Sequence, residues 1–141
     1  MMNFLGDYKL NKMLTMNSET EKTEFADPAT VYARMEAAGE DPRELRQMQM
    51  QIDTVMTVTE GELIYRLPIP ADAPKDEIEK MEKAGMIKDG MVEYERTPAK
   101  IEDSALYMYD RSTFLAGTEW VKISTDVEGE LNLIMAIWKK A

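Results

Sequence analysis

Residues 58–70 read VTEGELIYRLPIP, and residues 127–141 read VEGELNLIMAIWKKA, so the tetrapeptide EGEL occurs twice, at 60–63 and at 128–131. β-forming residues flank both copies. Glycine readily adopts the positive φ that short hairpins demand, so Glu60-Gly61 and Glu128-Gly129 each predict a tight turn between two strands. The similarity fades a few residues to either side. Turn chemistry therefore explains the repeat better than an internal duplication.

The segments around these turns carry the period of two that is typical of half-buried strands. Apolar and polar residues alternate along 121–127, and 131–139 resumes as the return strand. Around the first copy, 54–59 leads into the turn and 62–67 returns until Pro68 stops it. Two antiparallel hairpins are expected.

Further strands are predicted elsewhere. Residues 4–16 are interpreted as one long, bent strand, while 91–96 and 105–111 are rich in Tyr and Met and are expected to pair across the linking segment 97–104. Together these segments indicate a mainly β protein of about 8–10 antiparallel strands in an up-and-down barrel. At 141 residues the chain fits a single domain over 1–141.

Three helices interrupt the strands. Asp27-Pro28 and Asp41-Pro42 each place an N-cap acceptor before a first-turn proline, which predicts a short helix pair after the first strand, the first helix ending at Gly39. A third helix, 75–84, alternates acidic and basic residues and has a thin apolar stripe, so it is expected to lie on the surface.

This order of elements resembles the calycin superfamily, which includes the lipocalins, and within it the intracellular lipid-binding proteins. The opening FLGDYKL is similar to that family's F-x-G-x-[WY]-K-[LV] first strand, and the helix pair followed by TVMTVTEGELIYRL resembles its helical lid and next hairpin. The closing MAIWKKA resembles its last strand. The resemblance covers about residues 1–68 and 118–141 and implies a barrel that holds a small apolar or amphipathic ligand.

The chain departs from that family in two places. A Pro-flanked helix at about 74–84 stands where the family has consecutive short strands. The family's Arg-x-Tyr pair, which holds a fatty-acid carboxylate, falls on Ala136 and Trp138, and alanine forms no charge-assisted hydrogen bond. The family's carboxylate site is therefore not carried over.

Composition limits the function further. The net charge of −10 argues against nucleic acid, and no apolar run is long enough to span a membrane. The chain has neither Cys nor His, which removes disulfides, thiolate nucleophiles and His-based triads but leaves Tyr, Arg, Lys, Asp and Glu chemistry open. The acidic turn 126–130 lacks the spacing of a calcium loop, so no metal or other cofactor is predicted. The start of the chain shows no secretion signal, and a cytoplasmic location is expected.

The candidate ligand-binding residues are a cation and aromatic side chains in the predicted strands: Arg66, Tyr94, Tyr107, Tyr109, Trp120 and Trp138. For Arg66, the alternative is an outward-facing side chain paired to a cross-strand carboxylate. For the aromatic residues, the alternative is a packing role. The 13 methionines fit either a Met-rich core or an adaptable apolar cavity.

Segment 131–139 is apolar on both alternating faces, so a cover is expected over its outer face: a helix, the N-terminal strand or a second subunit. The first two covers fit a monomer, and the third fits a weak dimer. We expect a non-enzymatic binding protein. The alternatives are a barrel filled by its own side chains that acts as an interaction or structural module, and a His-independent lyase or isomerase that uses Tyr, Arg and Glu.

Overall fold

The computed structural model describes residues 3–16, 19–69, 73–110, 120–133 and 135–141. Within them the chain forms, in order, β1 (Gly6–Met16), β2 (Thr23–Ala26), α1 (Pro28–Ala37), α2 (Pro42–Asp53), β3 (Val55–Val58), β4 (Glu62–Pro68), α3 (Lys75–Lys83), β5 (Ile87–Lys88), β6 (Met91–Glu102), β7 (Ala105–Tyr109), β8 (Trp120–Lys122), β9 (Glu130–Asn132) and β10 (Ala136–Lys140). The protein is mainly β, as the sequence predicts.

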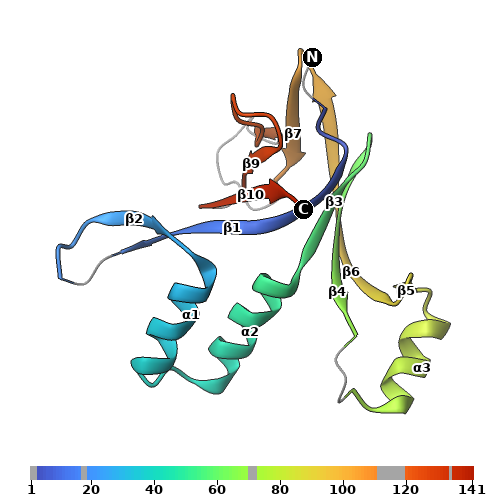
Figure 1. The fold of residues 1–141 in the computed structure, drawn as a ribbon. Coiled ribbons are helices and arrows are strands. Elements are labelled where there is room, and N and C mark those ends of the chain that lie inside the picture. The colour runs from blue at the N-terminus through green and yellow to red at the C-terminus, as the bar shows by residue number, and fades with distance from the viewer. Residues whose placement is uncertain (1–2, 17–18, 70–72, 111–119, 134) are drawn as a thin grey trace.

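The strands form one curled antiparallel sheet in the order β8-β7-β6-β4-β3-β1-β10-β9, with β2 and β5 as short additions to β1 and β6 (Figure 1). Apart from these additions, neighbours in the sheet follow one another along the chain, and the first strand pairs with the last. A bridge between Ser124 and Leu131 joins β9 to the segment after β8. This is the predicted barrel-like, up-and-down arrangement.

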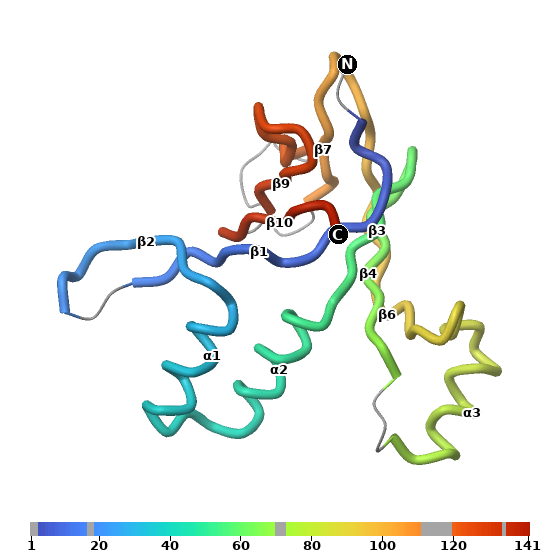
Figure 2. Tube along the Cα trace, in the orientation of Figure 1, coloured from blue at the N-terminus to red at the C-terminus, as the bar shows by residue number. Residues whose placement is uncertain are grey.

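The sheet opens on one side because β1 leaves its neighbour early. β1 pairs with β3 only from Gly6 to Lys9, and its second half pairs with β10 and β2 instead. A bulge after Leu10 bends the strand at this point, which confirms the predicted long, bent strand. The Cα trace in Figure 2 shows α1 and α2 below the far half of β1, with β4 and β6 farther to the right.

Both EGEL stretches are turns, as predicted. At the first, the Thr59 N–H donates to the Glu62 carbonyl (2.9 Å) and the Glu62 N–H donates to the Thr59 hydroxyl (3.1 Å). At the second, the Glu130 N–H donates to the Val127 carbonyl (3.2 Å), and Gly129 has a φ of 80°. The positive φ at Gly129 explains why that turn contains a glycine.

The return strand predicted over 131–139 is wrong in one respect, because the chain reverses within it. β9 and β10 are antiparallel neighbours, with Trp138 opposite Leu131, and the Leu133 N–H donates to the Ala136 carbonyl (2.9 Å). Met135, with a φ of 56°, lies in this reversal and is exposed. The reversal changes which residues face inward, and Leu131, Leu133, Ala136 and Trp138 are all buried.

The linker predicted over 97–104 is also wrong. β6 continues through Glu102, and a two-residue turn at Asp103-Ser104 leads directly into β7. Both turn residues have positive φ, 53° and 62°, without a glycine, so the usual signal for a tight hairpin was absent from the sequence.

The helices confirm the predicted starts and the surface role of α3. The Asp41 carboxylate caps α2 by accepting from the Arg43 N–H (2.8 Å), whereas Asp27 makes no side-chain cap bond to α1. Gly39 follows α1 with a φ of 71°. α3 buries none of its side chains, as its thin apolar stripe predicts.

The hydrophobic core lies inside the curl of the sheet. Its fully buried side chains come from five strands and the residue after β8, all far apart in sequence, namely Tyr8, Met56, Leu63, Leu106, Ile123 and Leu131. The Tyr8 hydroxyl is satisfied because it donates to the Phe4 carbonyl (2.8 Å). The methionines are divided: Met56 and Met108 belong to this core, whereas Met16 and Met135 are exposed.

Candidate functional site

A pocket of about 520 Å³ lies inside the curled sheet, between β1 and β10 on one side and β4, β6 and β7 on the other. Its volume is within the range of small-molecule sites, roughly 300–1,000 Å³. The residues that line it are Leu10, Met13, Gln51, Thr54, Tyr65, Tyr94, Glu95, Arg96, Thr97, Pro98, Met108, Tyr109, Asp110, Leu133, Ala136 and Trp138. Its apolar floor includes Leu10, Met13, Met108, Leu133 and Ala136, and at least as many polar or charged residues line the rest of the pocket, which is partly open to solvent.

Five consecutive residues of β6, Tyr94 to Pro98, line the pocket, and a β-bulge lies at the start of this run. Tyr65 pairs with Glu95 and Arg66 pairs with Glu93, so Tyr94 is the extra residue between them. In a regular strand Tyr94 and Glu95 face opposite sides of the sheet, whereas a bulge redirects side chains. Both therefore line the pocket, and the Tyr94 ring lies 6.1 Å from the Tyr65 ring at 41°.

Burial changes the chemistry of these phenols. Burial raises the pKa of Tyr65 well above its ordinary value, and the charge of Glu95 adds to the increase. Burial likewise raises the pKa of Tyr94, although its hydrogen bond with Thr54 partly offsets the increase. Both phenols keep their protons at neutral pH and serve as hydrogen-bond donors.

Trp138 supplies a polar group that lacks a partner. It lies on β10 between Leu10 of β1 and Leu131 of β9, is 7% exposed, and lines the pocket. Among the described residues, none accepts a hydrogen bond from its buried indole N–H. A buried donor without an acceptor costs free energy, so this group needs an explanation.

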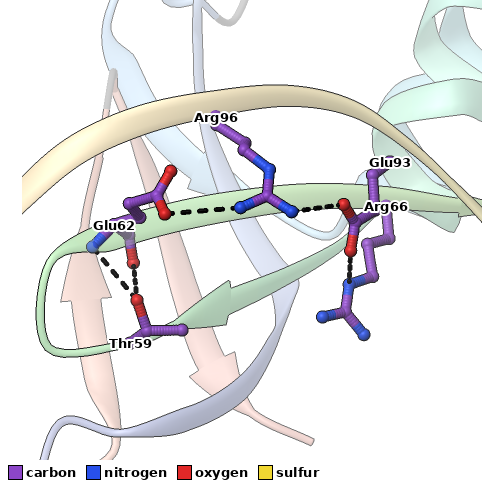
Figure 3. A network of polar contacts seen from close by, with 5 residues as sticks. All are labelled: Thr59, Glu62, Arg66, Glu93 and Arg96. Carbon is purple, nitrogen blue, oxygen red and sulfur yellow. Dashed lines mark hydrogen bonds and ion pairs between the residues drawn. The ribbon is translucent and has the colours of Figure 1, made fainter. Parts of the chain in front are cut away.

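Arg66 lies on the other face of β4 from the core residues Leu63 and Tyr65, and it does not line the pocket. Its Nε is 3.5 Å from Glu93 Oε1, directly across the strand pair (Figure 3). Arg66 therefore takes the alternative arrangement given in the sequence analysis, in which it pairs with a cross-strand carboxylate.

Glu93 links two arginines on this outer face. Its second oxygen accepts from Arg96 Nη2 at 2.7 Å, and Arg96 Nη1 donates to Glu62 Oε1 at 3.3 Å (Figure 3). The Glu93 side chain is only 7% exposed. The hydrogen bond from Arg96 lowers the pKa of Glu93, and the positive charges of Arg96, Lys88 and Arg66 lower it further. The Arg96 guanidinium is thus committed to the outer face, although the residue also lines the pocket.

The remaining predicted residues divide between the pocket and the outside. Tyr109 lines the pocket, and its ring meets that of Trp120 edge-on at 5.4 Å. Trp120 and Tyr107 do not line the pocket. Instead, Lys100 Nζ lies 4.5 Å from the Trp120 ring centroid and 5.8 Å from that of Tyr107, which are cation–π contacts.

The structure thus brings three of the six predicted residues to the pocket (Tyr94, Tyr109 and Trp138) and adds residues that the sequence analysis missed. Tyr65 and Glu95 are the most important. Alternation along β4 contained the signal for Tyr65, because placing Leu63 inside also places Tyr65 inside and Arg66 outside. Glu95 carried no such signal, since its orientation depends on the bulge.

No family model, curated protein sequence or solved structure matches this chain. Within the described part of the chain, no helix is long and apolar enough to cross a membrane. The same residues contain no cluster of three or more acidic side chains arranged to hold a metal ion.

Proposed function

We propose that this protein binds a small amphipathic molecule in the pocket of the curled sheet, as a calycin-like binding protein. The observation that carries the proposal is the Trp138 indole N–H, which is buried at the pocket and has no acceptor among the described residues. A ligand oxygen beside Trp138 would accept a hydrogen bond from the indole N–H and so remove the cost of a buried donor without an acceptor. The apolar side chains of Leu10, Met13 and Met108 would take the ligand's hydrocarbon part.

The pocket favours this function over a barrel filled by its own side chains. The pocket, about 520 Å³ and partly open to solvent, has the volume of a small-molecule site, which supports ligand binding over a purely structural role. Catalysis by the pocket tyrosines is disfavoured for a different reason. A general acid works best with a pKa near the operating pH, whereas the pKa values of Tyr65 and Tyr94 are raised away from it.

Native mass spectrometry tests the proposal. The protein is delipidated and then incubated with a pool of neutral, anionic and cationic amphiphiles of equal chain length. We expect a stoichiometric adduct that survives gentle ionisation. Ala136→Leu extends a side chain into the pocket and should weaken the adduct, whereas Ala38→Leu, on the exposed end of the first helix, should not. An unmodified mass under every condition overturns the proposal.

A further inference from the structure

The pocket contains a carboxylate without a counter-ion. Glu95 is directly opposite the core residue Tyr65 and lines the pocket, and its side chain reaches solvent there. No cation of the described residues lies within ion-pair distance of it, unlike Glu93 two positions earlier, which forms ion pairs with two arginines.

The described lining offers no cation to balance Glu95. Its one basic residue is Arg96, and that guanidinium is bound by Glu93 and Glu62 on the outer face (Figure 3). No described lysine lines the pocket. Within the described lining, the charge without an ion-pair partner is therefore that of Glu95, which repels a carboxylate and attracts a cation.

The aromatic lining adds a second attraction for positive charge. The Tyr65 and Tyr94 rings lie 6.1 Å apart beside Glu95, and the indole of Trp138 lines the same pocket. Aromatic faces attract ammonium groups through the ring quadrupole, and a nearby carboxylate reinforces that attraction. Aromatic rings together with one carboxylate form a recognised chemistry for binding amines.

From this arrangement we infer that the pocket selects amphiphiles with a protonated amine or quaternary ammonium head group over carboxylates of the same chain length. The head group lies against Glu95 and the Tyr65–Tyr94 pair, and the chain lies against the apolar floor. The inference rests on the proposed function, because it names the ligand class of the same pocket.

The test uses Trp138 as a reporter of binding. Trp120→Phe removes the other tryptophan, which lies outside the pocket, so the remaining emission comes from Trp138. Dodecanoylcholine, whose ester oxygens can accept from the Trp138 indole N–H, is the ammonium probe, and it is titrated beside dodecanol and dodecanoate below their micellar concentrations at physiological salt. We expect the ammonium probe to bind about tenfold more tightly than dodecanoate, with dodecanol between them.

Two further variants separate a local effect from the overall charge. Glu95→Gln should reduce the ratio of ammonium to carboxylate affinity to near one, whereas Glu60→Gln, in the exposed turn between β3 and β4, makes the same charge change away from the pocket and should preserve the ratio. Binding of dodecanol with no preference for the ammonium probe, or a preference unchanged by Glu95→Gln, overturns the inference and leaves the proposed function standing. Failure of all three probes to bind overturns both.

Discussion

The Thr54 hydroxyl lies 3.0 Å from the Tyr94 hydroxyl, and it also donates to the carbonyl of Met50 at 2.7 Å. Because a threonine hydroxyl has one proton, the bond to Met50 leaves its oxygen to accept from Tyr94. Thr54 is 1% exposed. This pair therefore joins the end of α2 to the bulge of β6 across the pocket, and it holds the Tyr94 ring in position.

Removing either member of this pair should destabilise the fold by different amounts. Tyr94→Phe loses one hydrogen bond and should lower the free energy of unfolding by about 1 kcal/mol. Thr54→Val leaves both the Met50 carbonyl and the Tyr94 hydroxyl without a partner, so we expect a loss of about 2 kcal/mol. Urea denaturation of both variants and of the double variant measures these losses. Strictly additive losses would contradict the interaction.

The parts of the fold that were predicted correctly have local causes. Asp41-Pro42 specifies a helix start within a few residues, and Glu128-Gly129 specifies a turn in the same way. The reversal before β10 has no such signal, because Met135 adopts its positive φ without being glycine or asparagine. Met135 is exposed, and its carbonyl accepts from the Leu14 N–H of β1 (2.8 Å), a long-range contact that the sequence pattern does not contain.

The site was harder to predict for the same kind of reason. Trp138, one of the predicted candidates, lines the pocket, and its inward orientation depends on the reversal before β10. Arg66 was chosen for its charge, although its neighbour Tyr65 holds the inward position. Glu95 was missed because the bulge at Tyr94 determines which β6 residues face the pocket. One extra residue in a strand reverses which of the following side chains face the pocket, and the alternation of the sequence does not reveal it.

The outer-face network around Glu93 should make stability depend on acidic pH. The hydrogen bond from Arg96, with the neighbouring positive charges, lowers the pKa of Glu93 below its ordinary value of 4.5. The contribution of ionised Glu93 to the stability of the fold is therefore fully present above pH 4.5 and is lost as the pH falls through the lowered pKa. Glu93→Gln should reduce stability at pH 7 by roughly 1–2 kcal/mol and should have a smaller effect at low pH.

Urea denaturation between about pH 7 and 3 measures this dependence. Glu60→Gln, in an exposed turn, is the matched control, and its curve should run parallel to that of the unmodified protein. If the free energies of unfolding of Glu93→Gln and of the unmodified protein differ by the same amount at every pH, then the charge of Glu93 contributes nothing to stability.

The buried phenols should make stability fall at alkaline pH. Burial raises the pKa of Tyr65, Tyr8 and Tyr94 above the ordinary 10.0, so the native state keeps protons that the unfolded state has lost. Stability is therefore complete below pH 10 and decreases as the pH rises above it. Tyr65→Phe should flatten this decrease, and ultraviolet absorbance titration should show the loss of a late-ionising phenol. An unchanged late step in Tyr65→Phe would assign it to another residue.

Two hairpin turns of this chain differ at one position, and the difference predicts a stabilising substitution. Asp89-Gly90 and Asp103-Ser104 each occupy a two-residue loop, and all four residues have positive φ, with 76° at Gly90 and 62° at Ser104. Side chains with a Cβ adopt this region at a cost of about 1–2 kcal/mol, whereas glycine adopts it freely but loses more chain entropy on folding. Ser104→Gly should therefore stabilise the protein by roughly 0.5–1 kcal/mol.

Gly90→Ser is the reciprocal experiment, because it recreates the Asp-Ser turn at the other hairpin. A Cβ added at Gly90 meets no atom within 4 Å, so its cost is conformational rather than steric. We expect Gly90→Ser to lower the melting temperature and Ser104→Gly to raise it, each by roughly 2–4 °C. Thermal denaturation followed by circular dichroism measures both. If Ser104→Gly lowers the melting temperature, then a contact of the Ser104 side chain outweighs the relief of its backbone, and positive φ is not what limits the stability of this turn.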